Sequence, residues 1–141
     1  MHRNIPKLDW KRIRALVRMA LEEDIGGGDA TSRAVIPRGM KASAVLLAKE
    51  DCVCAGMPVA EAVFKALDRR ASFKSLVREG EFCRKGTVMA EIRGNARALL
   101  GAERTALNFL QRLCGIATAV MKYSKAVEGI RTLVLDIRKM T

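Results

Sequence analysis

One stretch decides the fold of this 141-residue chain: residues 103–118, with the sequence ERTALNFLQRLCGIAT. Its apolar residues recur at helical spacing and predict a buried face that comprises Leu99, Ala106, Leu110, Leu113 and Ala117. At 100° per residue, a separate polar stripe forms from Arg104, Asn108, Gln111, Gly115 and Thr118. We therefore expect a long helix that starts at Asn95 as N-cap, bends or restarts near Gly115 and ends by Gly129.

The residues before this helix predict a mixed arrangement of helices and strands. An amphipathic helix is expected over residues 9–23, capped by Asp9 and stopped by the glycines at 26–28. A strand is expected at 42–49, a turn at 51–56, and a helix at 59–67 opened by Pro58. Two strands, 73–77 and 84–92, read as a twisted hairpin. A last strand is expected at 132–136, and this order of elements favours an α+β fold.

Composition limits the class of protein. Half of the residues are hydrophobic and 29% are charged, as in ordinary globular proteins, and no apolar run approaches the ~20 residues of a membrane span. The N-terminus is polar and lacks the apolar core of a secretory signal, so we expect a cytoplasmic protein without a membrane partner. The net charge of +11 favours anionic partners, but no run of cations interleaved with aromatics indicates nucleic-acid binding.

The four cysteines do not have the spacing of a metal site. Cys52 and Cys54 are two residues apart, Cys83 and Cys114 stand apart from them, and no Cys-x-x-Cys pair is present. We interpret them as reduced, mostly buried thiols.

Three cations are candidate binding residues. Arg138 and Lys139 follow the expected apolar strand 132–136, where a guanidinium beside an ammonium suits a carboxylate pair or a phosphate. Ordinary solvated charges are the alternative for both. Arg104 begins a polar stripe whose other members are uncharged, so this stripe faces either a site, another protein surface or solvent.

A carboxylate-rich loop at residues 22–32 has two interpretations. Its oxygens are of the kind that holds Mg²⁺. Helix termination followed by local turns, capped by Asp29 and Thr31, is the structural alternative that we favour.

At these residues the chain resembles the quinolinate phosphoribosyltransferase family, the carboxylating nicotinate-nucleotide pyrophosphorylases. Four stretches carry the resemblance: LEED at 21–24 with GDATS at 28–32, GMP at 56–58, the tract 103–118, and LDIRKMT at 135–141. The resemblance implies an N-terminal α+β domain with a small open sheet over residues 1–130. Residues 131–141 would then be only the first strand and loop of an α/β barrel.

The family resemblance also implies a reaction and roles for the three cations. The reaction joins quinolinate to phosphoribosyl pyrophosphate in NAD biosynthesis, giving nicotinate mononucleotide, CO₂ and pyrophosphate with the help of Mg²⁺. Arg104 would reach toward the quinolinate carboxylates in the partner subunit of a homodimer, and Arg138 and Lys139 would hold substrate at the barrel mouth. Ile137 and Met140 stand where the family has threonines. The resemblance places no ligand of this Mg²⁺ within the 141 residues of the chain.

The resemblance leaves the activity of this chain open. A barrel needs ~250 residues, so we expect the isolated chain to be catalytically incompetent. The alternative is a non-catalytic homologue that acts as a dimerisation or interaction module. A related phosphoribosyltransferase with another substrate is a third possibility.

Overall fold

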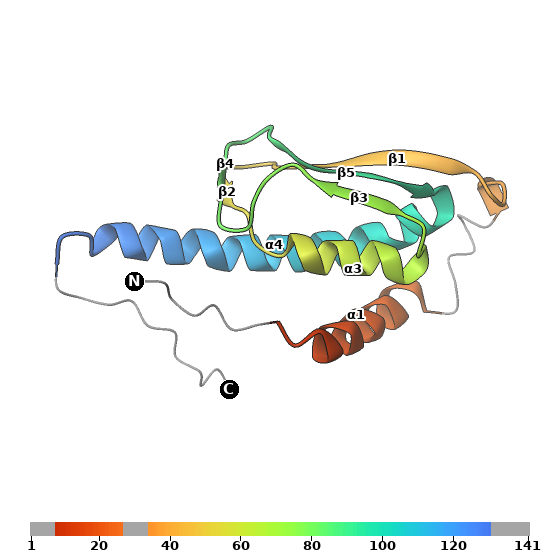
Figure 1. Cartoon of the computed structure of the whole chain (residues 1–141), viewed down its shortest axis with the longest axis horizontal. Coiled ribbons are helices and arrows are strands. Elements are labelled where there is room, and N and C mark those ends of the chain that lie inside the picture. Colours follow the sequence, from red (N-terminus) through yellow and green to blue (C-terminus); the bar gives the residue numbers. More distant parts are fainter. Residues whose placement is uncertain (1–7, 27–33, 131–141) are drawn as a thin grey trace.

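The structure, a computed structural model, describes residues 8–26 and 34–130 (Figure 1). The helices are α1 (Trp10–Ile25), α3 (Met57–Leu67) and α4 (Ala96–Ala126). The strands are β1 (Lys41–Leu47), β2 (Cys52–Val53), β3 (Ser72–Ser75), β4 (Phe82–Cys83) and β5 (Val88–Asn95). The predicted α+β class is confirmed, whereas the predicted strand 132–136 lies outside the described residues.

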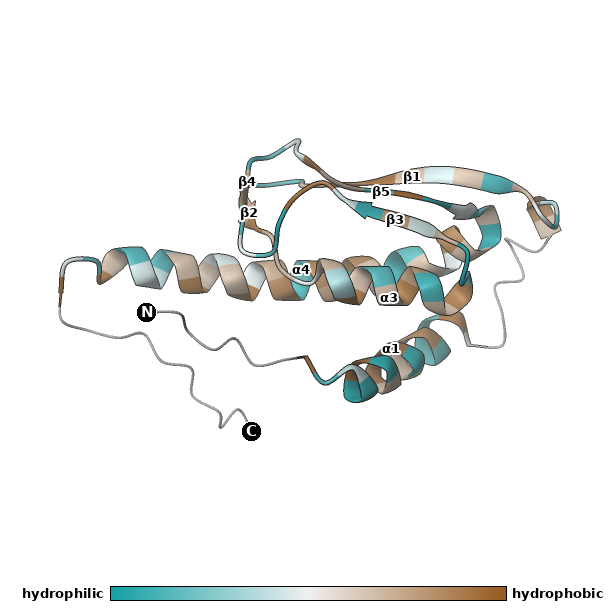
Figure 2. Cartoon of the chain, viewed as in Figure 1, coloured by the Kyte–Doolittle hydropathy of each residue, from teal (hydrophilic) through white to brown (hydrophobic). Residues whose placement is uncertain are grey.

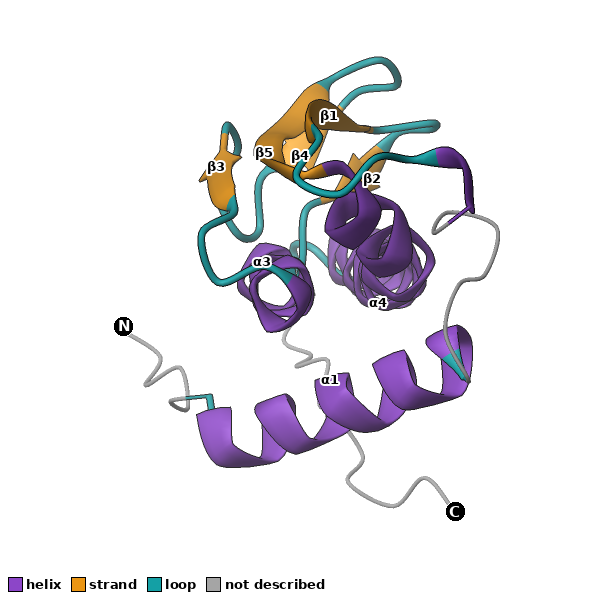
Figure 3. Cartoon of the chain, turned by 90° about the vertical axis from the view of Figure 1, so that its right-hand side faces the viewer, coloured by secondary structure: helices purple, strands orange, loops and turns teal. Residues whose placement is uncertain are grey.

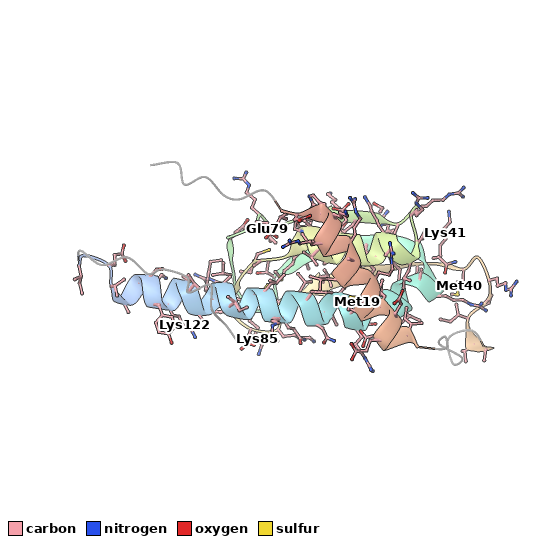
Figure 4. All side chains as sticks on the ribbon, turned by 90° about the horizontal axis from the view of Figure 1, so that it is seen from below. Met19, Met40, Lys41, Glu79, Lys85 and Lys122 are labelled. Carbon is pink, nitrogen blue, oxygen red and sulfur yellow. The ribbon has the colours of Figure 1, made fainter. Side chains whose placement is uncertain are left out.

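The elements form three layers. A sheet with strand order β1-β5-β3, antiparallel throughout, lies over α3 and α4, and α1 lies beneath these two helices (Figure 3). Seen from below, α1 crosses the other helices diagonally (Figure 4). The core lies between the layers and is formed by Val17 and Leu21 of α1, Val63 and Phe64 of α3, Ala90 and Ile92 of β5, and Leu99, Ala102, Ala106 and Leu110 of α4.

Side-chain caps begin two of the helices at the predicted residues. Asp9 accepts hydrogen bonds from the backbone N–H groups of Lys11 and Arg12, and Asn95 accepts one from Ala98. Gly26 ends α1 in a backbone conformation of positive φ, which glycine adopts without strain. The helix starts at Asp9 and Asn95 and the stop at Gly26 are therefore confirmed.

The long helix does not restart near Gly115, where a bend or restart was predicted. α4 runs for 31 residues through Gly115 without interruption. A single glycine costs a helix only about 1 kcal/mol relative to alanine, and burial of the preceding Leu110 and Cys114 offsets that cost. The C-terminal half of α4 extends beyond the sheet (Figure 1) and carries hydrophobic residues along its length (Figure 2).

The predicted hairpin is right in its pairing and wrong in its extent. β3 and β5 pair with Phe73 opposite Ile92, but β5 begins at Val88 rather than at residue 84. The preceding β4 pairs instead with β2, and this pairing places Cys52 opposite Cys83. β2 lies inside the segment 51–56, which we expected to be only a turn. This separate ribbon packs on α4 because the backbone N–H of Val53 donates to Thr118 Oγ1 at 2.9 Å.

The segment Gly56-Met57-Pro58 has a structural role at the start of α3. Gly56 has φ +99°, and a Cβ there would lie 2.5 Å from Leu113 Cδ1 of α4. Its N–H and that of Met57 donate to the Glu79 carboxylate at 2.8–3.1 Å, so this acid caps the positive end of α3. Close contact between α3 and α4 thus requires glycine at position 56.

Gly56→Ala tests this requirement against Gly86→Ala. Gly86 also has positive φ, yet a Cβ there meets no atom within 4 Å. We expect Gly86→Ala to lower the free energy of unfolding by about 1–2 kcal/mol through backbone strain alone. Gly56→Ala should lose about 1–3 kcal/mol more because Leu113 must move. Urea unfolding measures both, and equal losses would contradict the proposed contact.

Candidate functional site

The structure describes one of the three predicted binding residues. Arg104 is exposed on α4, whereas Arg138 and Lys139 lie outside the described residues, as do Ile137 and Met140. The structure therefore does not test whether the three cations lie close together, and their shared binding site remains a prediction. The predicted boundary between residues 130 and 131 likewise remains a prediction.

The predicted polar stripe exists over most of its length. Arg104, Asn108, Gln111 and Gly115 are all exposed along one side of α4. Thr118 differs from them because its hydroxyl accepts from Val53 N–H and donates to the Cys114 carbonyl at 2.6 Å. The stripe is thus a surface for its first three turns and an anchor for the β2–β4 ribbon at its end.

The guanidinium of Arg104 has no partner among the described residues. No hydrogen bond or salt bridge of Arg104 is found to any residue that the structure describes, although Glu103 precedes it on the helix. A guanidinium offers five donors in a planar fork that matches a carboxylate. The side chain is therefore available to an anionic ligand.

The residue after Arg104 anchors this turn of α4 to α1. Thr105 is 1% exposed, and its hydroxyl donates to the Asp24 carboxylate at the end of α1. Asp24 belongs to the carboxylate-rich stretch for which Mg²⁺ binding was one interpretation. The sequence analysis missed this contact, since 81 residues separate the two partners and no periodicity links them.

A second carboxylate supports the start of α4. Asp68 accepts hydrogen bonds from the backbone N–H groups of Asn95 and Arg70, both at 2.9 Å. These bonds, chiefly the one from Asn95, lower the pKa of Asp68 below the ordinary 3.8. Asn95 in turn caps α4 through Ala98 N–H. The helix that carries Arg104 is therefore held at its first turn and again at Thr105.

A groove of about 1030 Å³ runs between β1 and α4, beside the stripe. Its walls are largely apolar and include Leu46 from β1 and Leu99, Leu107 and Leu110 from α4. Gln111 and Gly115 belong to both the stripe and the groove. A ligand or protein surface that contacts Arg104 can therefore continue into an apolar depression.

The four thiols are closer together than their sequence spacing indicates. Cys52 faces Cys83 across the ribbon, and Cys114 of α4 hydrogen-bonds to Ala55. Burial, followed by the charge of Glu79, raises the pKa of Cys54 to about 12. Burial also raises the pKa values of Cys52 and Cys83. Strand pairing between two two-residue strands causes this convergence, and the spacing of the cysteines gives no signal of it.

The described residues contain no metal-binding cluster. Within 8–26 and 34–130, no three His, Cys, Asp or Glu side chains are arranged to hold a metal ion. In the same ranges, no helix is long and apolar enough to cross a bilayer.

A family profile and several known proteins match the chain. The profile described as Quinolinate phosphoribosyl transferase, N-terminal domain, matches residues 29–114. The chain is 36% identical over 128 residues to the chloroplastic carboxylating nicotinate-nucleotide pyrophosphorylase of Arabidopsis thaliana, covering 90% of this chain and 36% of that protein. It is 37% identical over 134 residues to a probable carboxylating nicotinate-nucleotide pyrophosphorylase of Synechocystis, covering 94% and 44%.

Solved structures share the fold. NadC from Streptococcus pyogenes superposes with a TM-score of 0.91 at 35% identity, covering 97% of this chain and 49% of that chain. The nicotinate-nucleotide pyrophosphorylase from Francisella tularensis gives 0.88 at 32% identity, covering 96% and 49%. The chain thus spans about half the length of these solved chains, and 36–44% of the two curated relatives.

A double-mutant cycle tests the bond between Thr105 and Asp24. Thr105→Val removes the hydroxyl at nearly constant volume, and Asp24→Ala removes its acceptor. Because both changes break the same hydrogen bond, the double variant should lose about 1 kcal/mol less unfolding free energy than the sum of the singles. Thermal or urea unfolding measures this, and simple additivity would contradict the bond.

The lowered pKa of Asp68 predicts a pH dependence of stability. Its contribution is present above the ordinary carboxyl pKa and is lost as the pH falls through the lower pKa of the folded protein. Asp68→Asn should therefore destabilise the protein at pH 7, and the difference from wild type should shrink on acidification. Urea unfolding across this pH range measures it; a difference that stays constant would contradict the assignment.

Proposed function

The chain belongs to the quinolinate phosphoribosyltransferase family through its N-terminal domain, and we propose that it is the N-terminal part of such an enzyme. The enzyme would be a pentosyltransferase that converts quinolinate and phosphoribosyl pyrophosphate to nicotinate mononucleotide, CO₂ and pyrophosphate. The names of the relatives support this reaction. The single observation that carries a role for this chain is that Arg104 is exposed on α4 and has no partner among the described residues.

Arg104 would bind a carboxylate of quinolinate in the active site of a partner subunit. Quinolinate is a dianion, so its pocket needs several cations, and each interacts more strongly in a partly dry site than in water. Arg138 and Lys139 would supply further positive charge at the barrel mouth. Positive charge near the ring would also stabilise the electron pair left when CO₂ departs.

The C-terminal half of α4 presents an apolar surface that supports burial against a second subunit. Three apolar or aromatic residues on the C-terminal half of α4 are more than 45% exposed: Ile116, Val120 and Tyr123. Exposed apolar residues along one helix are typical of an interface. We propose a homodimer in which this face covers the partner's barrel, in the cytoplasm and without nucleic acid.

The described residues do not fit a resident Mg²⁺ site. Glu22 and Glu23 are exposed and Asp24 is bonded to Thr105, so the carboxylate-rich stretch at the end of α1 offers no converging oxygens in the described part. The Mg²⁺ that the family implies would need ligands from outside these residues. No step of the proposal depends on it.

A chimera tests the role of Arg104 because the chain spans half of its solved relatives. This chain would replace the matching half of the Streptococcus pyogenes protein, and nicotinate mononucleotide formation from quinolinate and phosphoribosyl pyrophosphate would be measured. We expect Arg104→Ala to lower kcat/KM about 100-fold or more, which corresponds to roughly 3 kcal/mol of lost charge pairing. Arg104→Lys should recover only part, because an ammonium cannot form the bidentate contact.

Arg112 provides the matched control. It is an exposed arginine on the same helix, two turns further on and about 80° around the axis from Arg104. Arg112→Ala should leave the activity near that of the parent chimera. Equal effects of the two substitutions would contradict a specific role for Arg104. A folded chimera that lacks activity would favour the alternative, a non-catalytic interaction module.

A further inference from the structure

Two thiols meet in the groove between β1 and α4. Cys52, at the start of β2, and Cys114, on α4, both line this groove. Cys52 is half-buried, and Cys114 is 8% exposed. A small molecule that enters the groove can therefore reach a pair of cysteines from two different elements.

The backbone of the β2 segment holds Cys114 in place. Its sulfur accepts a hydrogen bond from Ala55 N–H at 3.3 Å and donates to the Ala55 carbonyl at 3.4 Å. One turn further along α4, Thr118 Oγ1 accepts from Val53 N–H. These contacts fix β2 directly against the helix turn that carries Cys114.

Cys52 and Cys114 lie close together in the groove. Among the other thiols, Cys114 acts most strongly on Cys52 and raises its pKa, although 62 residues separate the two in sequence. Cys83 lies opposite Cys52 in the ribbon but is only 2% exposed, and Cys54 is fully buried. Cys52 is thus the most accessible thiol of the group, and Cys114 is the second thiol that lines the groove.

We propose that Cys52 and Cys114 form an oxidative modification site at which a small peroxide converts the two thiols to a disulfide. The Cys52 thiolate attacks one peroxide oxygen, the O–O bond breaks, and Cys52 becomes a sulfenic acid as one water leaves. Cys114 then attacks the Cys52 sulfur and displaces the second water. With hydrogen peroxide, two thiols and one peroxide give one disulfide and two waters.

The bond would join β2 covalently to α4. It would remove the thiol hydrogen that Cys114 donates to the Ala55 carbonyl. Because α4 also carries Arg104, oxidation would tie the ribbon to the same rigid element that presents the proposed substrate contact. The modification itself requires only the described residues and does not depend on the proposed enzymatic activity.

The rate of oxidation should increase with pH. Only the thiolate reacts, and burial raises the pKa of Cys52, so less thiolate is present at neutral pH. The groups that face Cys52 are Cys114 from α4, Cys83 from β4 and Glu50 from the turn before β2, and each favours the neutral thiol. The test is therefore best run at mildly alkaline pH.

Non-reducing peptide mapping identifies the partner of Cys52. The reduced chain is treated with hydrogen peroxide, remaining thiols are alkylated in denaturant, and the protein is cleaved with trypsin. We expect a linked pair of peptides 50–65 and 113–122, two hydrogen atoms lighter than their sum, and a fall from four alkylatable thiols to two. When the chain is oxidised in denaturant, peptide 50–65 should no longer link preferentially to peptide 113–122.

Four alanine variants assign the bond. Peptide 50–65 contains both Cys52 and Cys54, so Cys54→Ala should keep the link while Cys52→Ala and Cys114→Ala abolish it. Cys83→Ala should also keep it. The proposal is overturned if peptide 50–65 joins peptide 79–84 through Cys83, if the link forms between two molecules on a non-reducing gel, or if all four thiols of the folded wild-type chain remain alkylatable.

Discussion

Burial of one face of α4 is the constraint on which the rest of the structure depends. Residues 96–114 of this helix contact the sheet above, α3 alongside and α1 beneath, so three layers share one core. The close approach of Leu113 to Gly56 fixes how near α3 can lie, and Thr118 fixes the ribbon. One uninterrupted helix of 31 residues carries all of these contacts.

The same helix links packing to the proposed chemistry. Arg104 is exposed, yet the next residue is among the most deeply buried in the chain. In the proposed role, Arg104 binds a carboxylate in another subunit. A backbone held in place by its buried neighbour favours this binding, because less conformational freedom is lost. The proposed substrate rests on the names of the relatives, whereas the structure gives a physical reason for presenting this arginine on a helix rather than on a loop.

Local signals were readable in the sequence and long-range ones were not. Asp9 and Asn95 cap helices through bonds that span two or three residues, so their pattern predicts them directly. The strand register that places Cys52 opposite Cys83 depends on how distant elements dock, as does the hydrogen bond from Thr105 to Asp24. No periodicity in the sequence predicts either contact. Arg104 was identified from a family resemblance and an unusually uncharged stripe, and its exposure agrees with both. Arg138 and Lys139 lie outside the described residues, so their role remains a prediction.

The most direct test of the central claim is a crystal structure of this chain joined to the second half of a solved relative, with quinolinate bound. The account predicts that the Arg104 guanidinium of one subunit lies about 3 Å from a quinolinate carboxylate oxygen in the site of the other. Quinolinate bound with both carboxylates paired to other residues, and Arg104 in solvent, would contradict it.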